Sequence, residues 1–270
     1  MSTTAVDAGW ERPAVREGFE FRAMAGVWRR HLILYRRFWH STTVSATLDP
    51  TIQLLAMGLG IGSLVAVVGG HPYIEFLGTG LVATAVLFGS IMPGMYDTFV
   101  LREFMKMYDG VLAAPLGIAE LVLGDATWLA ARTGVYSCTP MLIAMLFGLQ
   151  PTWGMLVVPF VAALSGLGFA LLGIWVSTIV PSFDTFNYVN SGLVTPLFLV
   201  SGTFFPLDRL PDWTRWITVF NPVYHCIQLV RDAAFGFHAG ADLLHALALA
   251  IFAALTGTLA VRGQRRKLID

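Results

Sequence analysis

The side chains that most often do chemistry are present in this sequence, but none of them falls into a catalytic or metal-binding pattern. The six histidines are scattered along 270 residues and form no H-E-x-x-H helix or comparable ligand set. There is no G-x-x-x-x-G-K-[ST] segment to cradle ATP phosphates, and no serine lies in a G-x-S-x-G turn. The sequence therefore predicts no enzyme active site, no metal site and no cofactor bound by this chain.

Residues 185–207 indicate a different chemistry, the handling of polar groups inside a membrane. This stretch has no acidic or basic residue, yet Asn187, Asn190, Ser191 and Thr195 form a polar stripe at helical spacing. Polar groups in hydrocarbon need a partner or water. We therefore take these four residues as candidates for a substrate path, although the stripe could equally face a neighbouring helix.

Ionisable residues inside apolar stretches are few and lie near their ends, at Asp49, Glu120, Asp125, Arg132 and Asp184. A proton-coupled carrier needs carboxylates or histidines deep in the bundle, so this scarcity weakens that class. We expect Arg132 to form a structural ion pair with Asp125 or Glu120. Glycines recur in the apolar stretches and serve either close helix packing or a flexible gate; they are Gly58, Gly60, Gly62, Gly166, Gly168 and Gly173.

The elements that must position these residues are membrane helices. Hydrophobic residues make up 56% of the chain and charged residues only 13%, against about 25% charged in a typical soluble domain. A net charge of zero also argues against a nucleic-acid partner. A spanning helix needs about 20 apolar residues, and the charge-free runs provide six. We predict an all-α integral membrane protein with spans at 49–68, 73–95, 126–147, 155–180, 186–204 and 243–261.

The basic residues predict the orientation of these spans. Seven Lys or Arg precede the first span, two follow the second and four follow the last, which puts thirteen on one side. The other side has three, all in the connection after span five. The positive-inside rule then places both termini in the cytoplasm. The chain divides into a cytoplasmic N-terminal segment (1–47), a transmembrane domain (48–261) and a basic tail (262–270).

Two segments outside the spans have distinctive patterns. Residues 19–40 carry aromatic and aliphatic side chains at steps of three and four, flanked by arginines, which predicts an amphipathic helix at the membrane surface. This helix is either a plain anchor or a contact for a cytosolic partner. The connection after span five, 205–242, contains three prolines and an apolar stretch interrupted by Arg231 and Asp232, which favours an interfacial or re-entrant helix.

Four groups of motifs resemble the permease subunits of ABC-2 type exporters, in the branch that includes nodulation-factor (lipo-chitooligosaccharide) export permeases. They are W-R-R at 28–30 with L-D-P at 48–50 and G-L-G-I-G at 58–62; Y-D-G-V-L-A-A-P-L at 108–116 with V-L-G-D at 122–125; S-G-T-F-F-P-L-D-R-L-P at 201–211; and N-P-V-Y-H at 221–225 with L-V-R at 229–231. Together these motifs extend over most of the chain, and their order and spacing carry the resemblance.

The resemblance implies a dimer of permeases, as a homodimer or with a related partner, in the inner or plasma membrane. It also implies two copies of a separate subunit that binds ATP and magnesium. The implied ATPase-coupling residues are Trp28, Arg29, Arg30, Arg102, Glu103, Lys106, Asp109 and Pro115. Phe204, Phe205 and Pro206 are the implied outer-gate residues, followed by extracellular re-entrant helices.

The expected function is outward export of an amphipathic, lipid-linked or glycolipid-like substrate by an ATP-driven transporter. Efflux of a hydrophobic drug or antibiotic by a permease of the same family remains open. A secondary carrier or channel without an ATPase, and a membrane scaffold or sensor without transport, are the alternatives from other classes.

Overall fold

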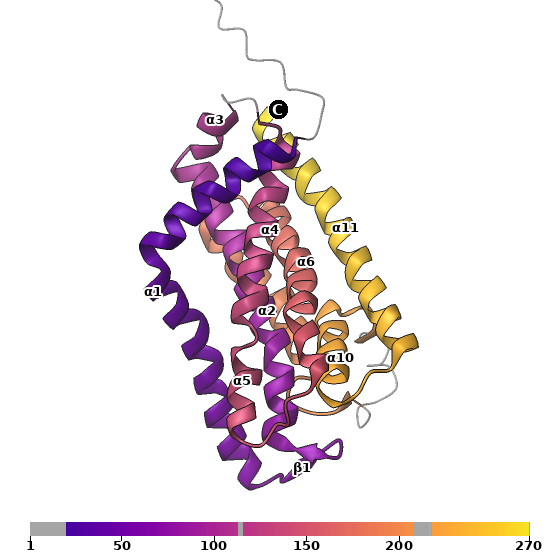
Figure 1. Ribbon diagram of the computed structural model, residues 1–270. Helices are drawn as coiled ribbons and strands as arrows, with labels where there is room; N and C mark the ends of the chain where they lie inside the picture. Colours follow the sequence, from indigo (N-terminus) through magenta and orange to yellow (C-terminus); the bar gives the residue numbers. More distant parts are fainter. Residues whose placement is uncertain (1–19, 113–115, 208–215, 217, 270) are drawn as a thin grey trace, which may run out of the picture.

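The computed structural model describes residues 20–112, 116–207, 216 and 218–269, and it is a bundle of long helices (Figure 1). By length and composition, five helical segments of this described part can cross a membrane: Phe21–Ser63, Tyr73–Phe104, Ile118–Leu146, Trp153–Ile179 and Ala239–Leu268. The one sheet among the described residues has two strands of two residues each. The prediction of an all-α membrane protein is confirmed.

Helix α1 (Phe21–Gly60) joins the predicted amphipathic helix and the first span in one element of 40 residues. Phe38 has non-helical angles (φ −118°, ψ 15°) and divides α1 into two arms. The first arm crosses the end of the bundle that also holds α3 and the C-terminus, and the second arm runs down its side (Figure 1). We call that end of the bundle the terminal end.

A tight hairpin links α1 to α2 at the opposite end (Figure 1). Its strands are β1 (Val67–Val68) and β2 (His71–Pro72). The two residues between them, Gly69 and Gly70, both have positive φ angles, +60° and +86°. This geometry suits a two-residue hairpin turn and is open to glycine at little cost.

The core lies around α2 (Tyr73–Phe99), which packs against α4 (Ile118–Tyr136), α6 (Val158–Ile179) and α10 (Pro222–Phe235). Small residues bring α2 and α6 into close contact. A Cβ added at Gly173 would lie 2.5 Å from the carbonyl oxygen of Ile91. Close packing therefore explains this glycine, whereas Gly60 has nothing within 4 Å of its added Cβ.

The connection from α2 to α4 contains a π-helical turn, η2 (Val100–Phe104), and the short helix α3 (Met107–Leu112). After α4 the chain continues in α5 (Thr139–Leu146) and, through the 3₁₀ turn η3 (Trp153–Val157), enters α6. The last helix, α11 (Ala239–Ile269), returns to the terminal end (Figure 1).

The predicted fifth span is shorter and less regular than expected. It consists of η4 (Phe183–Thr185), α7 (Phe186–Val189), the π-helical η5 (Asn190–Val194) and α8 (Thr195–Leu199). At about 1.5 Å per residue this run is roughly 25 Å long, less than the hydrocarbon thickness of about 30 Å. Among the described residues, the predicted count of six full-length spans is therefore not reached. This segment is a sixth helical segment, shorter than the other five.

Candidate functional site

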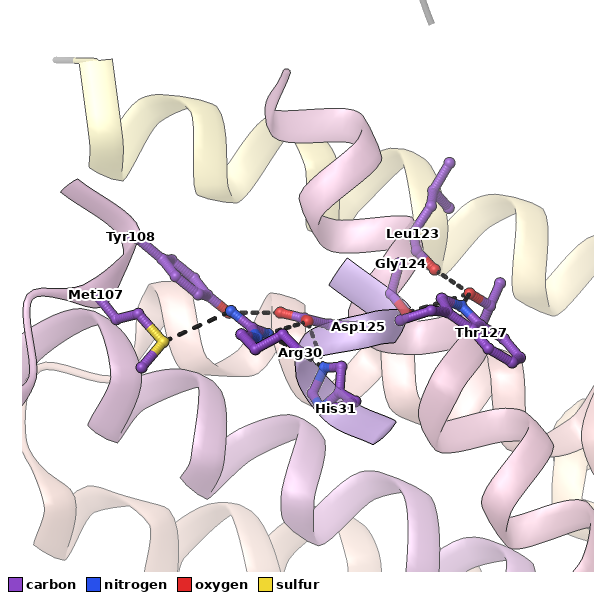
Figure 2. Close-up of polar contacts among 9 residues, drawn as sticks. Arg30, His31, Met107, Tyr108, Leu123, Gly124, Asp125 and Thr127 are labelled. Atoms are coloured by element: carbon purple, nitrogen blue, oxygen red, sulfur yellow. Dashed lines mark hydrogen bonds and ion pairs between the residues drawn. The ribbon is translucent and has the colours of Figure 1, made fainter. Parts of the chain in front are cut away.

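One carboxylate joins three elements at the terminal end of the bundle. Arg30 of α1 donates from Nη2 to Oδ1 of Asp125 on α4 at 2.6 Å, and Nε2 of His31 lies 2.7 Å from the same oxygen. The hydroxyl of Tyr108 on α3 donates to Oδ2 of Asp125 at 2.9 Å. Figure 2 shows these side chains converging on Asp125. We call Arg30, His31, Tyr108 and Asp125 the hub.

Aromatic packing holds the first arm of α1 against α4 beside the hub. The indole of Trp28 donates to Thr127 Oγ1 at 2.9 Å and meets Trp128 edge to face, with ring centroids 5.5 Å apart. His31 stacks on Trp128 at 5.5 Å. Trp28 and Arg30, two of the predicted coupling residues, thus face the bundle, while Arg29 is exposed.

Burial fixes the protonation state of the hub tyrosine. Tyr108 is 2% exposed. Burial raises the pKa of Tyr108 well above its ordinary value of 10, and the negative charge of Asp125 raises it further. The tyrosine therefore remains a neutral hydrogen-bond donor to Asp125 at physiological pH.

Arg102 is placed in the interior rather than on the surface. Its Nη2 donates to the carbonyl oxygen of Ser177 on α6 at 2.6 Å, and its Nη1 donates to Gln264 Oε1 on α11 at 3.3 Å. The side chain is 5% exposed. Any part that Arg102 plays in coupling therefore passes through α6 and α11 rather than through direct contact with another subunit.

The residues after Arg102 form the exposed part of this region. Glu103 accepts from Arg102 Nε at 2.9 Å and keeps 40% of its side chain exposed. Lys106 is exposed and has a φ of +49°, which turns the chain from η2 into α3. The side chain of Asp109 and all of Pro115 lie outside the described residues.

The polar stripe of the fifth segment divides between two environments. Asn190 donates from Nδ2 to the hydroxyl of Tyr96 on α2 at 3.0 Å. Asn187, Ser191 and Thr195 are exposed and share one face of the segment. Both alternatives for the stripe are thus represented: one residue contacts a helix of the same chain, and three present polar groups to whatever lies beside the bundle.

The S-G-T-F-F-P motif forms a turn at the end of α8. Gly202 has a φ of +86°, and its carbonyl oxygen accepts from Arg231 Nη2 on α10 at 2.8 Å. The guanidinium of Arg231 also lies over the ring of Phe76, 3.7 Å from its centroid. Phe204 packs edge to face on Phe198 at 5.2 Å.

Asn221 fixes the start of α10 to the same turn. Its Oδ1 accepts from the backbone nitrogen of Val223 at 3.0 Å, which caps the helix. Its Nδ2 donates to the carbonyl oxygen of Leu197 at 2.8 Å. Of the predicted outer-gate residues, Phe204 and Pro206 are half-buried in this arrangement and Phe205 is 44% exposed.

The expected pairing of Arg132 is wrong. Asp125 is occupied by Arg30 and His31, and Glu120 accepts from the backbone nitrogen of Glu20 at 3.1 Å. Asp125 and Arg132 are seven residues apart on α4, while the two partners of Asp125 on α1, Arg30 and His31, are 95 and 94 residues away in sequence. His31 could have been found, because it lies three residues after Trp28 and so shares the apolar stripe of the first arm.

Comparison with known proteins identifies relatives that match most of the chain. The family described as ABC-2 type transporter matches residues 23–235. The chain is 31% identical to Nodulation protein J of Rhizobium leguminosarum bv. trifolii and 30% identical to Nodulation protein J of Sinorhizobium fredii. Each match covers 90% of this chain and 93% of the relative.

A more distant relative is the inner membrane transport permease YadH of Escherichia coli. It is 22% identical over 80% of this chain and 84% of its own length. The family match covers the hub, the fifth segment and α10 together. The chain therefore belongs to the ABC-2 type transporter family and is a transmembrane permease of that family.

Proposed function

We propose that this chain is the membrane subunit of an ATP-driven exporter that moves an amphipathic, lipid-linked or glycolipid-like substrate outward across the inner membrane. Two copies of the chain form the conduit, and ATP and magnesium are bound by two copies of a separate subunit. Both termini of the permease lie in the cytoplasm. The hub is the observation that carries this proposal.

The hub supports the proposal because it makes a mechanical connection. The exposed surface of the first arm and the exposed turn at Glu103 and Lys106 lie at the terminal end. Asp125 ties the first arm and α3 to α4, which packs on the central helices α2 and α6. A movement of that surface is therefore transmitted through the contacts of Asp125 to the membrane helices.

Transport then follows from differential binding. The ATP-bound partner subunits favour one arrangement of this surface, and the two permease copies change their packing in response. The exposed face of Asn187, Ser191 and Thr195 supplies polar contacts to the substrate along an otherwise apolar segment. An amphiphile with a polar head and an apolar tail matches this mixture.

Reconstitution tests the proposal. The chain is placed in vesicles with its ATP-binding subunit, and outward movement of a fluorescent glycolipid is followed with and without ATP. We expect transport only with ATP and both subunits. Transport by the permease alone along an ion gradient would support a secondary carrier, and ATP-dependent movement of hydrophobic drugs but not of glycolipids would change the substrate class.

Lys106 allows the coupling surface to be tested separately. Lys106→Asn removes the charge, while asparagine accepts the left-handed backbone. We expect this variant to fold normally and to lower substrate-stimulated ATP hydrolysis by several-fold. Arg265→Gln, at an exposed position of α11, is the matched loss of a positive charge outside this surface. Full stimulation in Lys106→Asn would remove this turn from the coupling surface.

A further inference from the structure

A cavity with both polar and apolar walls lies between α1, α2 and α4. Its volume is about 470 Å³, and it is lined by residues from 41–50 of α1, from 85–93 of α2, and from 132–137 at the end of α4 and just after it. The α1 wall begins directly after the bend at Phe38, where α1 stands away from α4 (Figure 1). Sites for small molecules occupy about 300–1,000 Å³, so this cavity is large enough for a ligand.

The α1 wall carries polar side chains on one helical face. Ser41, Ser45 and Asp49 follow one another at intervals of four residues, and all three line the cavity. Asp49 is exposed on this wall, and a carboxylate on a membrane helix is costly unless it has polar surroundings. The cavity provides these surroundings for Asp49.

The α4 wall carries an arginine without a close partner. Among the described residues, the Arg132 side chain makes no hydrogen bond and no ion pair, and it does not pair with Asp49 across the cavity. The carboxylate of Asp97 on α2 acts on its charge only from a greater distance. The neighbouring hydroxyl of Ser137 is buried and likewise has no partner in the described part of the chain.

Hydrogen bonds between α1 and α4 hold the cavity in shape. The hydroxyl of Tyr136, which lines the cavity, is bonded to Thr43 Oγ1 at 2.7 Å and also to the hydroxyl of Tyr35. Tyr35 and Thr43 lie on opposite sides of the bend at Phe38. These two hydrogen bonds therefore stabilise both the bend and the shape of the cavity next to it.

We propose that this cavity binds the neutral, hydroxyl-rich head group of an amphiphile whose apolar tail stays in the bilayer. A guanidinium donor, a carboxylate acceptor and several hydroxyls match the alternating donors and acceptors of a sugar ring. Phe88 and Pro93 supply apolar surface for the faces of such a ring. The inference rests on the proposed function in that the bound amphiphile is taken to be a substrate.

The charges of the cavity disfavour an anionic head group. Of the side chains that line the cavity, Arg132 contributes one positive charge and Asp49 one negative charge, while Asp97 lies outside the lining and acts on Arg132. A phosphate bound to Arg132 would be repelled by Asp49 and, from farther away, by Asp97. A neutral head group can use Arg132 and Asp49 at once and leaves neither charge without a hydrogen-bond partner.

Photo-crosslinking tests this assignment. The full-length chain in phosphatidylcholine nanodiscs is titrated with a diazirine-bearing dodecyl maltoside, and the same alkyl chain on a phosphate group is the comparison probe. We expect the maltoside to label residues around the cavity. Ser45→Phe fills the cavity and should reduce this labelling by at least about tenfold, while Val44→Phe, one residue away on an exposed face, should leave it unchanged.

Arg132→Gln should weaken maltoside binding by about tenfold or more, because a hydrogen bond to a charged group is lost. If Arg132→Gln does not fold, as judged by gel filtration, the comparison of labelling between Ser45→Phe and Val44→Phe still tests the proposal. Equal labelling in Ser45→Phe and Val44→Phe, or tighter binding of the phosphate probe, would overturn the inference.

The binding assay contains no ATP-binding subunit, so it separates the two proposals. Absent cavity labelling together with intact ATP-driven export removes the cavity site and leaves the exporter function. Cavity labelling without ATP-driven export removes the exporter function and leaves the site.

Discussion

The two carboxylate oxygens of Asp125, on α4, bind side chains from α1 and α3. Its side chain is 7% exposed, and that of Arg30 is 21% exposed, so water cannot replace the lost interactions fully. Asp125→Asn keeps the shape and removes the charge. We expect it to lower the free energy of unfolding by about 1–3 kcal/mol, measured by thermal denaturation in detergent.

The same variant should reduce substrate-stimulated ATP hydrolysis in the reconstituted complex, because the first arm of α1 and α3 lose their common anchor. Asp184→Asn, at an exposed carboxylate, is the control for loss of one negative charge. Equal effects of the two substitutions would show that charge alone matters and that the hub transmits nothing.

Tyr108 gives the hub a pH dependence whose sign is fixed by its raised pKa. The unfolded chain releases the tyrosine proton near pH 10, while the folded protein retains it to higher pH. The contribution of Tyr108 to stability is therefore complete below pH 10 and is lost as the pH rises toward the folded pKa. The stability difference between the wild type and Tyr108→Phe should narrow between pH 8 and pH 11.

Denaturation midpoints at the two pH values measure this difference. Tyr188→Phe is the control, because Tyr188 is 79% exposed, and its difference from the wild type should stay constant. If the stability difference between the wild type and Tyr108→Phe is the same at pH 11 as at pH 8, burial does not keep Tyr108 protonated.

At the scale of elements, the turn after α8 depends on a close approach to α2. A Cβ at Gly80 would lie 2.8 Å from the carbonyl oxygen of Thr203, a backbone atom that can move only if the turn moves. We expect Gly80→Ala to lower stability by about 1–3 kcal/mol and to alter export by displacing Phe204.

Gly192→Ala is the matched control, since nothing lies within 4 Å of its added Cβ. Thermal denaturation and vesicle transport measure both variants. If Gly80→Ala behaves like Gly192→Ala in both assays, the turn is not held by this contact.

Hydropathy was a sound guide to the long helices because a charge-free run of sufficient length has few alternatives in a membrane. It was a poorer guide to the fifth segment. Its 23-residue run without charges, 185–207, contains both the helix that ends at Leu199 and the turn at Gly202, which is apolar but not helical. Only the contacts of Arg231 and Asn221 with the backbone there explain where the helix stops.

The sites were less predictable than the helices for a related reason. Sequence spacing reports neighbours on one helix, and it placed the aromatic side chains of residues 19–40 on one face. Trp28 and Tyr35 do share a face, since both pack against Trp128. Sequence spacing contains no information on which distant carboxylate contacts which arginine. The ion pair between Arg30 and Asp125, and the absence of Arg132 from it, could be seen only once the packing of α1 on α4 was known.

At the scale of the whole molecule, the exposed face of the fifth segment indicates how two copies meet. Asn187, Ser191 and Thr195 would face hydrocarbon if the chain stood alone, which costs free energy for each unpaired polar group. In the proposed dimer these residues face the shared path, so equivalent positions in the two copies lie near each other. In this dimer we expect the outer face of α11, where Leu255 is 60% exposed, to face lipid instead.

Cysteine cross-linking in native membranes tests this arrangement. Cys138 and Cys226 are buried and unpaired, so they leave a low background. We expect Ser191→Cys to form a dimer under mild oxidation and Leu255→Cys to remain monomeric. Addition of ATP and the partner subunit should change the Ser191→Cys yield, because the path opens between the two copies. A dimer through Leu255→Cys but not through Ser191→Cys would place the path on another face and would leave the polar stripe without a role in transport.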